Sequence, residues 1–448
     1  MIAPTLSSIP ATSAILHRSF SKEYPTAASG QGVYIQDHTG RLVLDGSSGA
    51  AVSCLGHGHK KVIEAIVEQA QQMSFAHTSF FTSDPAENLA SVLISTCPDV
   101  FSKVMFVSSG SEAVESALKL ARQYHLCNGQ PDRHIFISRR FAYHGNTLGA
   151  LSAGFNPPRR DPFQPMLSQA FRHVSPCFFT RDGLPGEDEE SYVDRLVAEY
   201  ETTISSLGSE KIAAIIVEPV SGATLGAVPA ARGYLGRLRE LCDRYGCLLI
   251  FDEVMCGMGR VGTMHAWQSL GGIAPDLQTI GKGLGAGYQP ISAILIANKV
   301  HAVLERNHEQ RPFVSGHTYQ GHSIGCAAAL ATQRAIAEDK LLDNVRRMGE
   351  RLSRRLKKET PMLKEVRGLG LFQAVEFATA TATPPGSSIA AAVASTCLEN
   401  GVAVYLCSSA VDAVLFAPPF IISESEIDKL VDVFVQSVKQ TIEKAKGS

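Results

Sequence analysis

Short apolar segments alternate with helical patterns through the middle of this chain, and this alternation restricts the fold more than any other feature. The segments expected to form strands are residues 104–108, 134–138, 213–219, 248–254 and 291–297. Helices are expected between them, most clearly at residues 112–124 and 234–245. Strands that are apolar almost throughout and are separated by helices form a mostly parallel sheet covered on both faces. We therefore expect an α/β protein.

The last 120 or so residues have a different pattern. They contain a charged helix at 341–358, a strand pair at 366–376, a loop rich in Thr, Pro and Gly at 379–388 and a final helix at 424–444. Together with the N-terminal segment they are expected to form a smaller α+β domain. The predicted division is an N-terminal part of the small domain at 1–60, a large domain at 61–328 and the C-terminal part of the small domain at 329–448.

Composition excludes several classes of protein. The formal net charge is −2, which offers no overall attraction to nucleic acid or to acidic lipid. No apolar stretch is long enough to span a membrane. His57 and His59 lack a third ligand at a recognisable spacing, so no metal site is expected. We therefore expect partners that are small molecules, with neither nucleic acid nor membrane among them.

Cysteine usage indicates the compartment. Ten cysteines in 448 residues, none in a Cys-x-x-Cys pair, are too sparse for a disulfide scaffold, and no secretory signal is visible. The expected location is the cytoplasm. The first 22 residues carry Arg18 and Lys22 and no acid, which leaves mitochondrial targeting as the alternative.

Ligands of parallel sheets lie at the carboxyl ends of the strands, so the residues that follow each strand are the candidates for function. Ser109, Gly110 and Ser111 follow one strand and open a helix. The N–H groups and the dipole of such a helix end attract an anion such as phosphate. Ordinary N-capping by the serines explains this segment equally well when it is taken alone.

Two further strand ends carry reactive side chains. Asp252 and Glu253 end one apolar strand, where a carboxylate can bind a cation, orient a histidine or hold a proton on a ring nitrogen. Lys282 lies among glycines after another short apolar segment; a buried lysine loses part of its basicity and becomes a nucleophile that forms imines. A nucleotide P-loop does not fit, because Gly283 follows the lysine where Ser or Thr is required.

Tyr143 and His144 follow the strand at 134–138, and an aromatic ring there can stack on a planar ligand. Each of these segments alone has a plain structural explanation. A phosphate site, an aromatic plate, a strand-end acid and an imine-forming lysine in this order suit one cofactor, pyridoxal 5′-phosphate (PLP), whose aldehyde needs a lysine and whose ring nitrogen needs an acid.

The chain resembles the class III (ω-) aminotransferases, which are PLP-dependent enzymes of fold type I, from about residue 30 to about 440. The resemblance rests on ordered motifs that include DGSSG at 45–49, SGSEAVESALKLAR at 109–122, YHG at 143–145, FDEV at 251–254, GKG at 281–283, TYQGH at 318–322 and VRGLGL at 366–371. It implies a large domain with a mostly parallel seven-stranded sheet covered by helices, and a small α+β domain built from both termini.

The resemblance also implies roles for the cofactor site. Lys282 would form the imine with PLP and move the proton between substrate and cofactor, and Asp252 would pair with the pyridinium nitrogen. Tyr143 and Val254 would pack on opposite faces of the ring. The remaining residues expected to contact the cofactor are Ser109, Gly110 and Ser111 at the phosphate, His144, and Glu218 near the ring or the substrate.

Three residues carry expectations about substrate and assembly. Arg367 matches an arginine that in several relatives forks onto a substrate carboxylate. Ala51 lies where some ω-amino-acid members have tryptophan, which implies a roomier pocket. Thr318 would reach the phosphate of the neighbouring subunit's cofactor, so a homodimer with active sites at its interface is expected. Residues 405–412 contain no arginine, although some ω-transaminases place a mobile second arginine there.

We expect an aminotransferase that passes an amino group from an amine or amino acid to a keto acid or aldehyde in a ping-pong cycle. The alternatives left open by the sequence are a PLP-dependent decarboxylase, racemase or phospho-lyase on the same fold. A non-enzymatic protein on this scaffold is disfavoured by the joint presence of Lys282, Asp252 and the serine-glycine turn at 109–112.

Overall fold

The computed structural model describes residues 13–20, 23–378 and 388–447. Residues 379–387 of the expected loop and most of the segment considered as a targeting peptide lie outside these residues.

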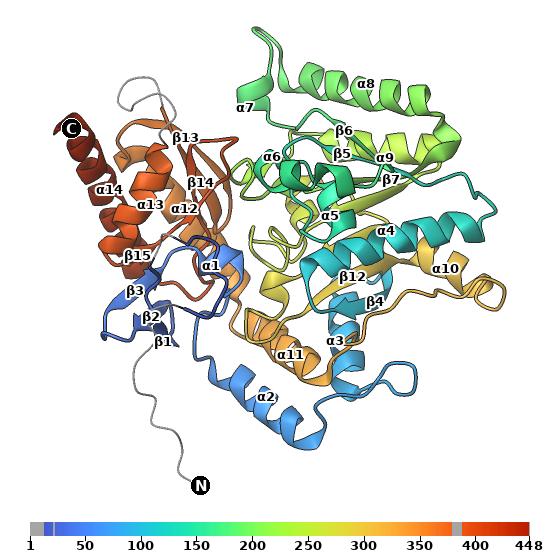
Figure 1. Cartoon of the computed structure of the whole chain (residues 1–448), viewed down its shortest axis with the longest axis horizontal. Helices are drawn as coiled ribbons and strands as arrows, with labels where there is room; N and C mark the ends of the chain where they lie inside the picture. The colour runs from blue at the N-terminus through green and yellow to red at the C-terminus, as the bar shows by residue number, and fades with distance from the viewer. Residues whose placement is uncertain (1–12, 21–22, 379–387, 448) are drawn as a thin grey trace.

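A seven-stranded sheet forms the centre of the larger part of the molecule, in the order β4-β12-β11-β10-β7-β5-β6 (Figure 1). Its strands are β4 (Phe101–Val107), β5 (Ile135–Arg139), β6 (Phe171–Val174), β7 (Ile212–Val217), β10 (Leu248–Asp252), β11 (Leu277–Ile280) and β12 (Ser292–Ala297). β11, β10, β7, β5 and β6 are parallel neighbours, whereas β12 runs antiparallel to both β11 and β4. The mostly parallel sheet is therefore confirmed, with one strand reversed.

Helices cover both faces of this sheet because alternate side chains of each strand enter two apolar cores. Ile215 and Val217 of β7 pack with helices α3 (Asp84–Ser95), α8 (Glu189–Leu207) and α9 (Tyr234–Tyr245). Ala214 and Ile216 belong to the other core, with α4 (Gly110–Cys127) and α10 (Asn298–Arg306). A strand whose side chains are buried on both sides is apolar throughout, which is the pattern the sequence displays.

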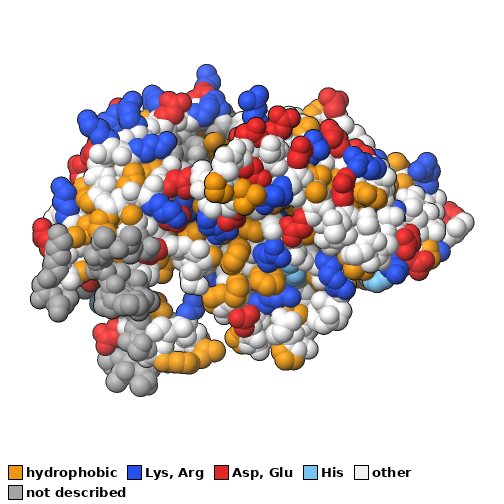
Figure 2. Space-filling model, turned by 90° about the horizontal axis from the view of Figure 1, so that it is seen from above, with side chains coloured by type: hydrophobic (Ala, Val, Ile, Leu, Met, Phe, Trp, Pro, Cys, Tyr) orange, Lys and Arg blue, Asp and Glu red, His pale blue; other side chains and the backbone are white. Residues whose placement is uncertain are grey.

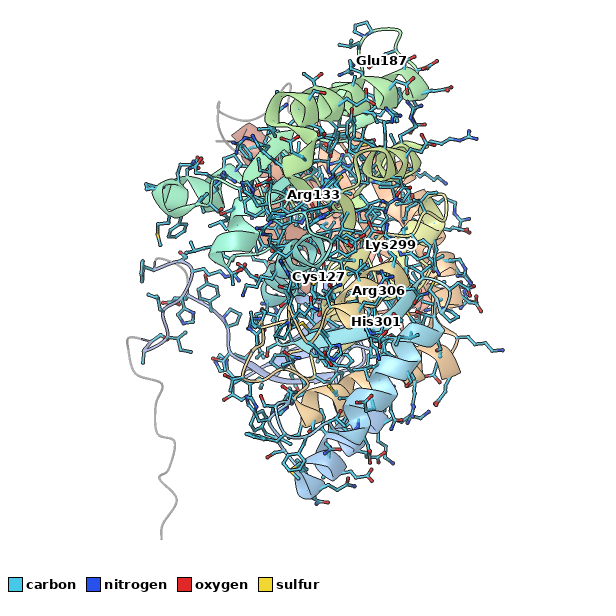
Figure 3. All side chains as sticks on the ribbon, turned by 90° about the vertical axis from the view of Figure 1, so that its right-hand side faces the viewer. Cys127, Arg133, Glu187, Lys299, His301 and Arg306 are labelled. Carbon is cyan, nitrogen blue, oxygen red and sulfur yellow. The ribbon has the colours of Figure 1, made fainter. Side chains whose placement is uncertain are left out.

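The amino-terminal edge of the sheet is fastened by Arg133, which is labelled in Figure 3 together with Lys299, His301 and Arg306 of α10. The buried guanidinium of Arg133 donates to the backbone oxygens of Ser209 and Ile212 before and in β7, and to that of Tyr245 at the end of α9. These contacts tie the start of β7 to the end of α9. The opposite side of the sheet, where the parallel strands have their carboxyl ends, is free to form a binding site.

The C-terminal part forms a second, smaller sheet with helices on it. The strands are β13 (Leu363–Leu369), β14 (Phe372–Phe377), β17 (Ala413–Phe416) and β16 (Tyr405–Leu406), in that order. The helices are α12 (Leu341–Glu359), α13 (Ile389–Glu399) and α14 (Glu424–Gly447). Their apolar faces share one core, in which Phe377 and Phe416 both contact the ring of Phe434.

The two ends of the chain meet in a third sheet. β1 (Ala27–Gln31), β2 (Tyr34–Asp37) and β3 (Leu42–Asp45) form an antiparallel meander, and β15 (Val402–Ala403) pairs with β3 in parallel. This pairing supports a small domain drawn from both termini. The exact division at residues 60 and 328 stays a prediction, and residue 328 falls inside α11 (Ser323–Glu338), which packs on α3 and on α2 (Lys60–Gln72).

The remaining elements are short and connect these layers. They are α1 (Ser48–Ala51), α5 (Leu148–Ala153), α6 (Pro157–Arg160), α7 (Phe179–Asp182), β8 (Val220–Ser221), β9 (Val228–Pro229) and the single-turn helices η1 (Asp161–Met166), η2 (Ser209–Lys211), η3 (Ala266–Leu270) and η4 (Lys282–Leu284).

Basic and acidic side chains are interspersed on the face drawn in Figure 2, as the near-zero net charge leads one to expect. Within the described residues, no helix combines the length and the apolar character needed to cross a lipid bilayer.

Candidate active site

A cavity of about 520 Å³ lies at the carboxyl ends of the parallel strands, against β16 of the small domain. Most of the residues singled out in the sequence line it together, although they come from five separate stretches of chain. They are Gly110, Ser111, Tyr143, His144, Glu218, Asp252, Val254 and Lys282. The parallel sheet brings these residues together because strand ends that are distant in sequence share one edge.

The first wall of the cavity is the N-terminus of α4. Ser109 caps this helix, since its Oγ accepts from the backbone N–H of Glu112 at 3.2 Å, and the Glu112 carboxylate accepts from the backbone of Ser108 at 2.7 Å. The first N–H groups of the helix, on Gly110 and Ser111, have no acceptor within the helix. They face the cavity at the positive end of an 18-residue helix dipole, which suits a phosphate.

Two glycines let the backbone close in around this wall. A Cβ on Gly110 would lie 2.7 Å from Cγ1 of Val254, so only glycine permits the helix start and the valine to be neighbours. Gly145 has φ +134°, and a Cβ there would lie 2.6 Å from Oγ of Ser111. The Ser111 hydroxyl itself accepts from the backbone N–H of Asn146 at 3.0 Å.

Asp252 is held by three donors at the end of β10. Nδ1 of His144 donates to its Oδ2 at 2.7 Å, and its Oδ1 accepts from the Thr279 hydroxyl at 2.9 Å and from the backbone of Val254 at 3.1 Å. Both Asp252 and His144 are buried, and Nε2 of His144 has no hydrogen-bond partner among the described residues. The carboxylate is thus fixed in place and oriented at the cavity, ready to accept one more proton-bearing group.

Lys282 begins the single turn η4 after β11, with φ +44°. Burial lowers the pKa of its ammonium group, against the opposing effect of the nearby Asp252 and Glu218 carboxylates. No hydrogen bond of its side chain occurs within the described residues. A lysine in this state holds a larger fraction of reactive neutral amine at a given pH than a lysine in water.

Glu218 and Tyr143 complete the polar lining. The Glu218 carboxylate accepts from the backbone N–H of Gly222 at 2.8 Å and of Tyr143 at 3.3 Å, and burial raises its pKa. Burial also raises the pKa of the Tyr143 hydroxyl, and its ring lies beneath the guanidinium of Arg159. Glu253, the acid next to Asp252, turns away and accepts from the backbone of Ala266 and Trp267.

Arg367 does not reach the cavity. Its buried guanidinium pairs with Glu376 at 2.5 Å and Glu365 at 2.9 Å, and donates to the backbone oxygens of Leu225 and Gly226. These acceptors occupy its whole fork, so the expectation that Arg367 holds a substrate carboxylate does not agree with this structure.

Three other expected residues lie outside the lining as well, and one of them is Ser109, the cap of α4. The side chain of Ala51 is buried in an apolar cluster with Phe372 and Leu415, and its neighbour Ala50 lines the cavity instead. Thr318 is exposed on the segment before α11. Its expected role concerns a neighbouring subunit, so it stays a prediction.

Several lining residues were missed in the sequence. They are Arg18, Asn156, Pro158, Arg159, Met255 and Cys256; the segment from Tyr405 to Ser409, which the resemblance already singled out, also lines the cavity. Pro157 marks a turn, but nothing in the run of Pro, Pro, Arg and Arg at 157–160 tells which arginine faces a ligand. The lining by β16 and the loop after it depends on how the small domain packs, which no local pattern reveals.

The arrangement fits PLP on grounds of this structure. The cavity offers N–H groups and a helix dipole for a phosphate, the close-packed Val254 and Gly110, a fixed carboxylate, and a half-buried amine that makes no hydrogen bond within the described residues. Among the described residues, no group of three or more His, Cys, Asp or Glu side chains is placed to hold a metal ion.

Comparison with known proteins agrees with this geometry. The family model for class III aminotransferases matches residues 20–438. An uncharacterized aminotransferase of Schizosaccharomyces pombe is 41% identical over 93% of both chains, and a chloroplastic gamma aminobutyrate transaminase of Solanum lycopersicum is 33% identical over 92% of this chain and 80% of its own. The PMP-bound aminotransferase from Vibrio fluvialis superposes with a TM-score of 0.89 at 31% identity, covering 94% of each chain.

The fold and the site therefore define a PLP-dependent transferase of fold type I. Within that class, the chain belongs to the class III aminotransferases, and its cofactor is PLP. The predicted family, fold and enzyme class are confirmed.

Proposed function

We propose that this aminotransferase binds PLP in the cavity at the strand ends with Lys282 as its covalent partner. The observation that carries the proposal is the half-buried amine of Lys282 in the same cavity as the fixed Asp252 carboxylate and the open helix end of α4. Gly110 and Ser111 bind the phosphate, with Ser109 capping the helix behind them. Val254 and Tyr143 flank the ring.

PLP, when bound, supplies an aldehyde and an electron-withdrawing ring that exchange an amino group with the substrate. The chain's own residues do the rest. Asp252 would hold a proton on the ring nitrogen, and His144 and Thr279 keep its carboxylate oriented. The Nζ of Lys282, when not bound to the cofactor, would be placed to accept and donate a proton. Glu218 borders the reacting end.

The test uses light absorption and mass. Purified protein loaded with PLP should absorb visible light, and an amine donor added without acceptor should bleach it. Borohydride reduction should fix one cofactor per chain on the peptide that contains Lys282, and Lys282→Ala should lose both the adduct and turnover. An adduct on any other lysine contradicts the proposal.

Transamination is distinguished from other PLP reactions by stoichiometry. Donor alone should convert one equivalent of cofactor to its amine form per chain, and a keto acid should restore it. Release of carbon dioxide or phosphate, or inversion of the amino acid without such conversion, would instead support a decarboxylase, phospho-lyase or racemase.

We infer that donor and acceptor are small amines, amino acids and keto acids. One relative is named a gamma aminobutyrate transaminase and another a vanillin aminotransferase, so ω-amino acids and aromatic aldehydes are the first compounds to screen. Pyruvate and 2-oxoglutarate serve as acceptors. The initial rates with each pair rank the substrate classes.

A homodimer with its active sites at the interface is part of the proposal. Phe80, Phe81, Val314 and Tyr319 are large apolar side chains left exposed in the single chain. Tyr319 contacts Phe75, and His77 contacts Phe80, so the segments at 75–81 and 314–322 form one surface. An exposed apolar surface of this kind suits contact with a second copy.

Mixing two inactive variants tests the shared site. If Thr318 serves the neighbouring subunit, a dimer of one Lys282→Ala chain and one Thr318→Ala chain contains one intact site. Activity should therefore return when the two are refolded together, and sedimentation should give twice the chain mass. Absence of recovery, with mixed dimers present, contradicts the role of Thr318.

We also propose a cytoplasmic location. All ten cysteines are free and eight of them are buried, which suits a reducing compartment. Subcellular fractionation tests this, with mitochondrial recovery as the contrary result.

A further inference from the structure

Two adjacent arginines of α6 have opposite environments. Arg160 is buried and donates to the backbone oxygens of Ser152 at 3.1 Å and Gly154 at 2.7 Å, so it holds the loop in place. Arg159 is exposed and lines the cavity. The buried arginine fixes the backbone from which its neighbour reaches the cavity.

The guanidinium of Arg159 is supported but not neutralised. Its central carbon lies 5.3 Å from the centre of the Tyr143 ring, a cation–π distance that keeps the group over the cavity. No carboxylate or carbonyl of the described residues accepts a hydrogen bond from it. Arg18, which also lines the cavity, is likewise without a hydrogen bond or ion pair in the described part of the chain. A planar guanidinium group whose N–H donors have no acceptor is suited to bidentate hydrogen bonding with a carboxylate.

The charges of the lining are separated. The two lining acids, Asp252 and Glu218, lie at strand ends, and both already accept hydrogen bonds from the protein. The arginines come from α6 and from the N-terminal segment, and the lining segment from Tyr405 to Ser409 carries no charge. A ligand with an amine or carbonyl at one end and a carboxylate at the other complements this lining. Its amine or carbonyl would lie at Lys282, and its carboxylate would lie at the arginines.

We propose that Arg159 is a specificity-determining residue that binds the carboxylate of the substrate, and that the enzyme therefore favours amino acids and oxo acids over amines and aldehydes without a carboxylate. This inference rests on the proposed function of the cavity. It assigns to Arg159 the contact that Arg367, bound to Glu376 and Glu365, cannot make.

Matched substrates and variants test this role. Arg159→Met keeps an unbranched apolar stem and removes the charged group, and Arg159→Lys keeps the charge without the fork. For Arg159→Met, kcat/KM for 4-aminobutanoate should fall roughly 10- to 100-fold, the range for a hydrogen-bonded charge, while that for butylamine changes by less than about threefold. Arg159→Lys should lie between. Arg354→Met, at an exposed arginine of α12, is the matched control and should behave as wild type.

Binding gives a readout independent of turnover. Butanoate should bind the PLP-loaded wild type more tightly than butanamide by calorimetry, and Arg159→Met should remove that preference. Equal binding of the two ligands to wild type, or an unchanged donor ratio in Arg159→Met, overturns the inference. A wild type that is not bleached by any amine donor contradicts the proposed function itself, whereas normal bleaching with no selectivity at Arg159 contradicts only this step.

Discussion

Asp252 shows how a single carboxylate is prepared for its role. One carboxylate oxygen accepts a hydrogen bond from the His144 imidazole at 2.7 Å. The other accepts hydrogen bonds from the Thr279 hydroxyl and the backbone N–H of Val254, so the carboxylate cannot rotate. Its burial would be costly if these donors were absent. The carboxylate is thus positioned before any ligand arrives, which is the condition for a stable charge opposite a ring nitrogen.

Asp252→Asn should separate binding from catalysis. The amide keeps the size of the side chain, so the phosphate site and Lys282 remain and borohydride should still fix the cofactor. The rate of amino transfer in a single turnover should fall roughly 10²- to 10⁴-fold, because the amide cannot hold the ring proton. Asp194→Asn, at an exposed acid of α8, should leave the rate unchanged. An unaltered single-turnover rate in Asp252→Asn would remove the assignment.

The arginines mark the limit of prediction at the residue scale. The sequence singled out Lys282, Asp252, Tyr143 and the Ser109–Ser111 turn, because each lies at or after the end of a strand and strand ends share an edge; their roles stay predictions. It did not reveal which arginine faces the ligand. The direction of Arg367 depends on Glu376, which lies diagonally across the β13–β14 pair, and that of Arg159 depends on the ring of Tyr143. Such contacts are tertiary and leave no local pattern.

At the scale of elements, the start of α4 combines a cap, a glycine and a neighbouring strand end. The Ser109 cap and the Glu112 carboxylate fix the first turn, and Gly110 allows Val254 to pack against it. The phosphate site therefore depends on residue 110 having no Cβ atom. α9 was predicted at its observed bounds, but the reversal of β12 was not, because strand direction depends on the route of the chain after Lys282.

Gly110→Ala should damage this junction. The new Cβ would lie 2.7 Å from Cγ1 of Val254, so the valine or the helix must shift, at a cost of about 1–3 kcal/mol in stability. Thermal unfolding should occur at a lower temperature, and titration should show weaker PLP binding. Gly236→Ala, inside α9 with its nearest neighbour at 3.9 Å, should instead stabilise by up to ~1 kcal/mol and leave PLP binding unchanged. Equal PLP affinity in both variants would contradict the role of Gly110.

At the scale of the whole molecule, three histidines lie outside the cavity: His125 and His265 are buried, and His173 is half-buried. Burial lowers the pKa of His173 and of His265 to about 4, and that of His125 is lowered as well. His265 joins α3 to η3: its Nε2 lies 2.8 Å from the Thr96 hydroxyl, its Nδ1 lies 3.0 Å from the Gln278 amide, and its ring stacks on Trp267. These contacts suit a neutral ring.

These histidines should therefore destabilise the protein in mild acid, whereas the Glu253 carboxyl, whose pKa burial raises to about 8, contributes with the opposite sign. Below pH 6.5 these histidines take up protons in the unfolded chain. In the folded protein His173 and His265 do so only near pH 4. Between these values the unfolded state binds more protons, so the free energy of unfolding decreases as the pH falls, by about 1 kcal/mol per pH unit for each such histidine; above pH 6.5 this contribution is constant.

Urea unfolding of the PLP-loaded protein between pH 7.5 and 5 measures this slope. His265→Gln should be less stable at pH 7.5, because the Thr96 and Trp267 contacts are lost. Below pH 6.5 its free energy of unfolding should depend less steeply on pH, because the contribution of one histidine to the slope is removed. His308→Gln, at an exposed histidine, should keep the wild-type slope. His265→Gln should thus lower the stability at pH 7.5 and reduce its loss in acid. A variant that is less stable but keeps the wild-type slope would show that His265 packs the core and that the fold does not lower its pKa.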